Sequence, residues 1–310
     1  MVEFAPRLDF GRFPTQLERR DGGLEVVNAA DLVVLRSPGV EWTILDAGMH
    51  QTARAEIDLD RGPVTLEMRC GTASMRPDRT DEIRRRERTT DFWRHWAQTL
   101  ELPAVSPEMV RRSALTLKAL CYGPAGSILA AATTSLPEML GGVRNWDYRY
   151  CWIRDASMSA SALVRLGSIE EAMDFLDWLL GVIDHSEVGP ERLAPLYTVN
   201  GQSLPPEATI EELAGYAGSR PVRVGNAADH QVQLDVFGPV LELIHQLGEV
   251  HAPLSARHWR LVEDLVGAVD QRWTEPDQGI WEVRSAPRHH VHSKTMCWVT
   301  VDRAVRIAEN

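Results

Sequence analysis

The spacing of apolar residues changes once along this chain, and that change constrains the fold more than any other feature. Up to about residue 78, stretches such as "LEVVNAADLVVLRS" and "VEWTILDAG" alternate apolar and polar residues between Gly, Pro and Asp, which is typical of strands. From Ser106 onward, apolar residues recur at helical spacing. The sequence therefore predicts an all-β region followed by a helical one, and 310 residues are enough for two domains.

A charged segment, 79–105, lies between these regions. Its first 22 residues contain neither Gly nor Pro, which predicts a linking helix. Beyond it, Ser106 followed by Pro107 is a helix start signal. We therefore expect domains over 1–78 and 106–310 joined by 79–105. The second domain is predicted to hold six helices, at 108–122, 156–167, 168–185, 229–249, 255–273 and 293–309.

The composition excludes several classes of partner. The net charge of -11 repels nucleic acid phosphates and anionic lipid, and no apolar run is long enough to predict a membrane helix. The N-terminus lacks the apolar region of a secretory signal, so we expect a cytoplasmic protein. The cysteines show neither metal-ligand nor disulfide-framework spacing; they are Cys70, Cys121, Cys151 and Cys297.

The loop "RNWDYRYCWIRDAS", residues 144–157, concentrates aromatic and charged side chains before a predicted helix. Aromatic faces stack on the C–H surfaces of sugars, while Arg and Asp make charge-assisted hydrogen bonds to hydroxyls. The loop therefore predicts a sugar site. The alternative is a packed helix entry with Asp155 as the N-cap.

A second loop, "GSRPVRVGNAADHQVQLD" at 218–235, carries Arg220, Arg223 and Asn226 ahead of a predicted helix. It could hold an anion at the helix N-terminus. It matches neither the dinucleotide fingerprint nor the phosphate loop, so nucleotide binding is not favoured.

The stretch "GIWEVR" places Glu282 directly after Trp281. An apolar wall disfavours the charged form of a carboxyl, so the group stays protonated near neutrality and can act as a general acid. The alternative is an exposed glutamate paired with Arg284.

The stretch "RHHVHSKTM" contains His289, His290 and His292. Three histidines so close together can suggest a metal, but no carboxylate stands at ligand spacing, and we predict neither metal nor cofactor. Lys294 in the same stretch could reach a substrate hydroxyl.

Taken together, three long motifs resemble glycoside hydrolase family 15, the inverting glucoamylase, glucodextranase and bacterial trehalase group, and in particular its trehalase-like branch. They are "AATTSLPEMLGGVRNWDYRYCWIRDAS", "GYAGSRPVRVGNAADHQVQLDVFG" and "PDQGIWEVRSAPRHHVHSKTMCWVTVDRA". The resemblance implies an N-terminal antiparallel β-sandwich, partly present, followed by an (α/α)6 barrel of which about half is present.

The resemblance also implies roles for single residues. Glu282 matches the general acid, and Arg154 with Asp155 matches the pair that holds the nonreducing-end glucose. The remaining residues expected to bind substrate are Trp146, Trp152, Arg220, Arg223, Trp281 and Lys294. One departure is Val283, which stands where glucoamylases carry a second acidic residue.

An inverting hydrolase also needs a general base, roughly 6.5–9.5 Å from the acid. The resemblance implies that this base lies beyond residue 310, and that the chain starts late as well. The carboxylates within the chain that could substitute are Asp147, Asp155, Glu212 and Asp235. We expect the base outside this chain and no activity of the chain alone.

The reading favoured by these motifs is an inverting α-glucoside hydrolase that acts on trehalose or short α-glucans, with trehalose preferred. A noncatalytic fragment or carbohydrate-binding remnant is the alternative from another class, since half a barrel exposes apolar helix faces and predicts self-association. An (α/α)6 glycoside phosphorylase is the other enzyme alternative, with Arg220, Arg223 and His289 available to phosphate.

Overall fold

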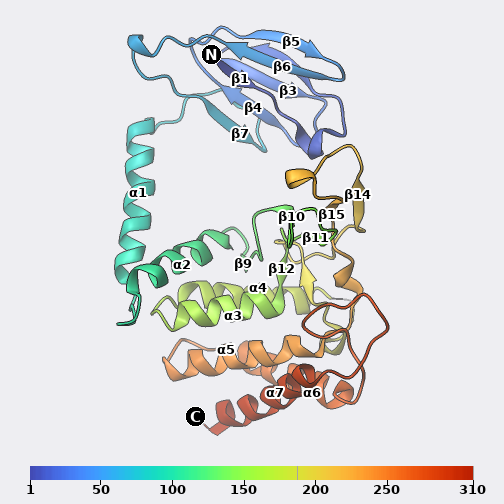
Figure 1. Ribbon diagram of the computed structural model, residues 1–310. Helices are drawn as coiled ribbons and strands as arrows, with labels where there is room; N and C mark the ends of the chain where they lie inside the picture. The colour runs from blue at the N-terminus through green and yellow to red at the C-terminus, as the bar shows by residue number, and fades with distance from the viewer. Residues whose placement is uncertain (187, 310) are drawn as a thin grey trace. The chain divides into compact units, whose positions relative to one another are not determined.

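The computed structural model describes residues 1–186 and 188–309. The chain divides into two compact units, Met1–Trp93 and Arg94–Asn310. The first is rich in strands and the second in helices (Figure 1). The predicted order of a β region followed by a helical region is confirmed.

The first unit contains two antiparallel sheets, one of strand order β1-β6-β5 and one of order β2-β3-β4-β7. The strands are β1 Val2–Phe4, β2 Gln16–Arg20, β3 Gly23–Val27, β4 Val33–Arg36, β5 Thr43–Ala47, β6 His50–Ala55 and β7 Glu67–Cys70. In the larger sheet, β2, β3 and β4 follow one another closely along the chain, as expected for hairpins, whereas β7 pairs with β4 only after the chain has passed through β5 and β6 of the other sheet.

One apolar cluster joins the two sheets. Leu24 and Val26 of β3 are buried at alternate positions, because side chains of a strand point to opposite faces. They belong to the same cluster as Ala53 and Ala55 of β6, in the other sheet. The two sheets therefore share a core, as in a β-sandwich.

Helix α1, Glu82–Thr99, carries the boundary between the units. Near its start, Arg85 bonds Glu67 of β7 at 2.9 Å. Near its end, Trp96 donates its indole N–H to Ser168 at 3.1 Å and to Glu171 at 3.2 Å. The first compact unit therefore extends past residue 78 into this helix.

The second unit is built from longer helices. They are α2 Pro107–Leu120, α3 Ile153–Val164, α4 Glu170–Asp184, α5 Phe237–Glu249, α6 Ala256–Arg272 and α7 Val291–Glu309. All six correspond to predicted segments; four begin within two residues of the predicted start, and two begin further away. Helix α3 begins three residues before the predicted 156, and α5 begins at Phe237 rather than 229.

The late start of α5 has a local cause. Residues Ala227–His230 and Leu234–Val236 form two short 3-10 turns instead of α-helix. The side chain of Asn226 caps the first turn, and the buried carboxylate of Asp277 accepts the backbone N–H of Leu234 at 3.0 Å. These side-chain bonds offer the backbone an alternative to the helix.

Helices α3, α5 and α7 pack side by side, with α4 against α3 and α6 against α7 (Figure 1). On α5 the fully buried positions include Val240, Ile244 and Leu247, which share one face of a 3.6-residue helix. Phe175 and Leu179 of α4 join the same core. This cluster forms the rigid support for the loops at one end of the helices.

Short antiparallel strand pairs stand in the loops that the sequence predicted to be irregular. They are β8 Cys121–Tyr122 with β9 Ser127–Ile128, β10 Thr134–Pro137 with β11 Asn145–Asp147, β12 Cys151–Trp152 with β13 Leu196–Tyr197, and β14 Ala208–Ile210 with β15 Val222–Val224. These pairs give the loops backbone hydrogen bonds, so the loops are ordered platforms.

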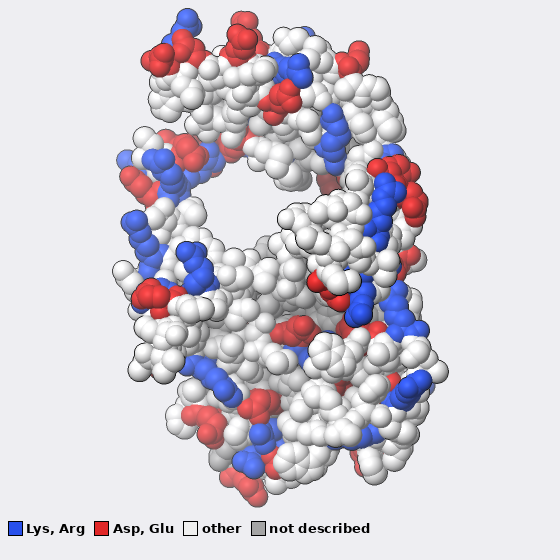
Figure 2. Space-filling view, viewed as in Figure 1, with Lys and Arg blue, Asp and Glu red and all other residues white. Residues whose placement is uncertain are grey.

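Acidic and basic side chains are interspersed on the visible face in Figure 2. Many form ion pairs, such as Arg272 with Glu275 at 2.8 Å. Across the described residues, no helix combines the length and apolar character needed to cross a membrane.

Candidate functional site

The loop between α6 and α7 is anchored at both of its ends. Asp277 and Arg288 exchange backbone hydrogen bonds of 2.8 Å, and Gln278 donates its backbone N–H to Val232 at 2.9 Å. Gly279 has a φ of 66°, and a Cβ there would lie 2.9 Å from the ring of His290. Only glycine fits this turn.

Glu282 follows the turn and itself has a φ of 52°, in the left-handed region. Its N–H donates to Gly279 at 2.9 Å, and its carbonyl accepts from the side chain of Gln231 at 3.2 Å. Such a conformation is uncommon for a residue with a Cβ and persists only when its surroundings hold it. The loop therefore fixes the place of this carboxylate.

Three donors converge on one oxygen of Glu282. Oε1 accepts the indole N–H of Trp152 at 2.6 Å, an amide N–H of Gln233 at 3.2 Å and a guanidinium N–H of Arg154 at 3.4 Å. Among the described residues, no hydrogen bond to Oε2 is found. Oε2 is therefore the oxygen left to carry a proton or to meet a ligand.

Arg154 stands in the first turn of α3, with a side chain only 8% exposed. It lies 3.2 Å from a carboxylate oxygen of Asp155, 3.3 Å from one of Asp235 and 3.4 Å from Oε1 of Glu282. Burial by itself would lower the pKa of Arg154, but the carboxylates of Asp155, Asp235 and Glu282 outweigh it and raise that pKa. The guanidinium is thus a fixed positive charge among three acids.

Asp155 differs from Asp235 in its access to solvent. The side chain of Asp155 is half-exposed, whereas that of Asp235 is fully buried. Burial raises the pKa of Asp235, against the opposing effects of Arg154 and His292. Asp155 is the carboxylate of this group that a ligand can reach.

A second cluster surrounds Trp146. The guanidinium carbons of Arg223 and Arg284 lie 4.5 Å and 4.2 Å from the centre of its ring. Both arginines pair with Glu207, at 3.5 Å and 2.6 Å. The hydrogen bonds from Arg284 hold the pKa of Glu207 below its ordinary value although burial opposes them. Arg284 therefore pairs with Glu207, and the alternative of a Glu282–Arg284 pair is wrong.

The structure brings together only part of the predicted set. Trp152 and Arg154 bond the carboxylate of Glu282, and Asp155 pairs with Arg154. Trp146 and Arg223 belong to the neighbouring cluster. Arg220 is exposed. Trp281 is 86% exposed, so the expected apolar wall beside Glu282 is wrong. The donors Trp152, Gln233 and Arg154 occupy that place instead.

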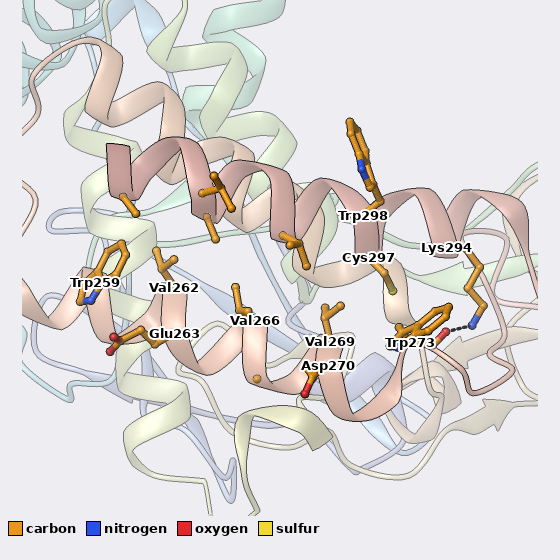
Figure 3. A pocket seen from close by; sticks show the side chains of 15 residues that line it. Trp259, Val262, Glu263, Val266, Val269, Asp270, Trp273, Lys294, Cys297 and Trp298 are labelled. Atoms are coloured by element: carbon orange, nitrogen blue, oxygen red, sulfur yellow. Dashed lines mark hydrogen bonds between the residues drawn. The ribbon is translucent and has the colours of Figure 1, made fainter. Parts of the chain in front are cut away.

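Lys294 is a residue of α7 whose side chain reaches the C-terminal end of α6. Its ammonium donates to the backbone carbonyl of Trp273 (Figure 3) and to that of Glu275, so it satisfies carbonyls at and just beyond a helix end. It is not among the groups that bond Glu282. The alternative of Asp155 as an N-cap is also wrong, because Trp152 takes that position and Asp155 stands in the first turn.

Two residues of this site were missed. Gln231 and Gln233 fall in the segment predicted as helix, where alternate side chains would diverge. In the extended segment between the 3-10 turns, both contact Glu282. The signal that could have found them is the alternation "QVQ" in a loop rich in turn-forming residues.

The histidines do not form a metal cluster. Within 1–186 and 188–309, no group of three His, Cys, Asp or Glu side chains is arranged to hold an ion. Nδ1 of His292 lies 3.6 Å from Asp235, and the ring of His290 packs at Gly279.

Two hollows lie near the helices. One, of about 500 Å³, is lined by Arg154 and His292 together with residues of α3, α5 and α7, so it adjoins the site. Another, of about 940 Å³, lies between α6 and α7 and is lined mainly by apolar side chains, including Trp259, Val266 and Trp298 (Figure 3). Glu282 and its donors do not line this larger groove.

The chain is similar to known families over most of its length. The sequence profile described as "Glycosyl hydrolases family 15" matches residues 104–310, and that described as "Trehalase-like, N-terminal" matches residues 1–93. The second profile ends where the first compact unit ends.

Several proteins named trehalase are similar to this chain. That of Thermoplasma acidophilum is 38% identical over 235 residues, which cover 76% of this chain and 40% of the relative. That of Mycobacterium tuberculosis is 41% identical over 222 residues, which cover 71% of this chain and 33% of the relative. "Trehalase 1" of Sulfolobus acidocaldarius is 40% identical over 221 residues, which cover 71% of this chain and 38% of the relative. The aligned part of this chain spans 33% to 40% of these three relatives.

Proposed function

The chain belongs to family 15 of the glycosyl hydrolases, and from that premise we propose that the protein carrying it is an inverting α-glucoside hydrolase of the trehalase type. Glu282 is its general acid and gives a proton to the glycosidic oxygen. Arg154 and Asp155 hold the hydroxyls of the nonreducing-end glucose. Trehalose is preferred to short α-glucans because the similar proteins are named trehalases.

One observation carries the proposal, namely the convergence of Trp152, Gln233 and Arg154 on Oε1 of Glu282. A general acid must present its proton in a fixed direction. With Oε1 occupied by donors, the proton resides on Oε2. The carboxylate of Asp155 is half-exposed and lies 3.2 Å from Arg154, so its oxygens can also accept hydrogen bonds from sugar hydroxyls. Donor and acceptor groups for a sugar thus lie beside the acid.

The second carboxylate of an inverting pair comes, in our proposal, from outside these 310 residues. Asp155 and Asp235 are the acids nearest to Glu282 through Arg154, and both are engaged by that guanidinium. The curated relatives are considerably longer than the aligned part. Helices α3, α5 and α7 pack side by side in the sequence of the chain, and this packing supports the related proposal that residues 106–310 are the first half of an (α/α)6 barrel.

The test is to incubate the natural protein with trehalose and with maltotriose and to monitor the release of glucose by proton NMR during the reaction. Inversion at one carbon of α,α-trehalose yields one α-glucose and one β-glucose, so early spectra should show both anomers in equal amounts. Two α-anomers would contradict inversion. Failure to cleave either sugar would overturn the function, and glucose phosphate formed in phosphate buffer would identify a phosphorylase instead.

The placement of the base has its own test. We expect the 310-residue chain alone to release no glucose while it still binds a glucose-like inhibitor such as deoxynojirimycin in calorimetry. Glucose release by this chain at the rate of the natural protein would place the base within it.

A further inference from the structure

Gln233 is a buried amide whose two ends are both used in the site. Its side-chain oxygen accepts a guanidinium N–H of Arg154 at 2.8 Å. Its nitrogen donates to Oε1 of Glu282 at 3.2 Å and to the side-chain oxygen of Gln231 at 3.0 Å. Gln233 therefore links the arginine to the glutamate by a path other than their own 3.4 Å contact.

Arg154 decides which way this amide faces. A guanidinium has only donors, so the group that meets it must be the oxygen of Gln233. The amide nitrogen then faces Glu282 and Gln231, whose oxygens accept. The reversed amide would set its N–H groups against the guanidinium and its oxygen against Oε1 of Glu282. The orientation is thus fixed by chemistry and not only by packing.

Gln231 completes the arrangement from the other side. Its oxygen takes the second N–H of Gln233, and its own nitrogen donates to the carbonyl of Glu282 at 3.2 Å. That carbonyl belongs to the residue with a φ of 52°. The two glutamines therefore hold both the backbone and the carboxylate of Glu282.

Building on the proposed function, we propose that Gln233 is a positioning residue for Glu282. Its amide, oriented by Arg154, keeps Oε1 as an acceptor, so that the proton for the glycosidic oxygen is carried by Oε2. Gln233 does not touch the reacting atoms. It acts through Glu282, and the favoured residue at this position is one that accepts on one side and donates on the other.

The experiment compares Gln233→Leu and Gln233→Glu with Gln278→Leu. The first removes the donor to Oε1, and the second places a carboxylate against it. Gln278 serves as a structural control, because its side chain accepts the backbone N–H of Val232 at 2.9 Å and does not bond the carboxylate of Glu282. Gln233→Leu and Gln278→Leu each lose the hydrogen bonds of a side-chain amide.

The first readout is independent of activity. In protein labelled with ¹⁵N-tryptophan, the indole resonance of Trp152 is identified among the ten tryptophans by its absence in Trp152→Phe. Because this N–H bonds Oε1, its resonance reports the geometry of that contact. Gln233→Leu and Gln233→Glu should both displace the resonance at neutral pH, because each changes the group that meets Oε1. Gln278→Leu should leave it in place.

The second readout is kinetic. With trehalose, Gln233→Leu should lower kcat about tenfold and change KM by less than about threefold. An unmoved indole resonance in both Gln233 variants would overturn the proposal, as would equal displacements in Gln278→Leu. If the natural protein cleaves no α-glucoside, the proposed function fails, while the indole resonance still decides whether Gln233 holds Oε1.

Discussion

The indole nitrogen of Trp152 lies 2.6 Å from Oε1 of Glu282, although the two residues are 130 positions apart. The first closes strand β12 at the entry to α3, and the second sits in the loop before α7. Trp152 is 2% exposed, so its N–H has no solvent to bond and would be costly to leave unpaired. The contact therefore ties the carboxylate to the helical core.

Replacing Trp152 by phenylalanine should weaken the proposed acid. A hydrogen bond to a charged group contributes about 1.5–3 kcal/mol, so we expect kcat/KM for trehalose to fall about 10- to 100-fold. Trp178→Phe is the matched control, because its indole N–H also lies in the core but donates to the carbonyl of Val199 at 3.0 Å. Equal losses in both variants would assign the effect to packing.

Replacing Glu282 by glutamine should remove the proton and keep the shape. We expect turnover of trehalose to fall by roughly 10² or more, with little change in the affinity for deoxynojirimycin. Glu212→Gln alters an exposed loop acid and should retain full turnover. Near-normal turnover by Glu282→Gln would remove this residue from the acid role.

The fold follows from local signals to a large extent. The alternation of apolar residues such as Leu24 and Val26 predicts a strand, and the helical spacing of Val240, Ile244 and Leu247 predicts α5. Each spacing is typical of one kind of regular secondary structure. The starts of α3 and α5 were missed. They depend on tertiary bonds, such as that from Leu234 to Asp277, which no local pattern contains.

The candidate site was predictable only in part, for a similar reason. The aromatic and charged residues near Arg154 in the sequence predict a sugar site without knowledge of their tertiary contacts. The role of Gln233 depends on contacts with residues 79 and 49 positions away. Trp281 shows the opposite error, because adjacency in sequence suggested a wall that the turn at Glu282 does not build.

The cluster around Glu207 predicts a dependence of stability on pH. Its folded pKa is depressed, by hydrogen bonds from Arg284 foremost, so its contribution is present above the unfolded value of about 4.3 and is lost as the pH falls through the folded value. Glu207→Gln should therefore cost about 1 kcal/mol at pH 7 and nothing near pH 2. Urea unfolding at both pH values measures this.

The exposed Glu249 provides the control for that experiment. Glu249→Gln should leave the free energy of unfolding unchanged to within about 0.5 kcal/mol at either pH. A Glu207→Gln cost that is the same at pH 7 and near pH 2 would show that the carboxylate charge contributes nothing and that shape alone matters.

Lys118 of α2 and Glu171 of α4 form an ion pair that is more buried than the pair of Arg284 and Glu207. Glu171 is only 4% exposed, and it also accepts from Ser168 at 2.6 Å and from Trp96 at 3.2 Å. Burial opposes its ionisation, but the hydrogen bonds from Lys118 and Ser168 outweigh burial and lower its pKa. Removing the ammonium would leave a buried carboxylate with neutral donors alone.

We therefore expect Lys118→Met to lower the free energy of unfolding by about 2 kcal/mol at pH 7, less than for a fully enclosed pair because Lys118 is partly exposed. The double variant Lys118→Met with Glu171→Gln should recover more than half of that loss, because its amide needs no counter-charge. The folded pKa of Glu171 lies below its unfolded value, so the wild-type advantage should also decline as the pH falls below about 4.3. A double variant no more stable than Lys118→Met would show that the lysine stem, through packing, accounts for the loss.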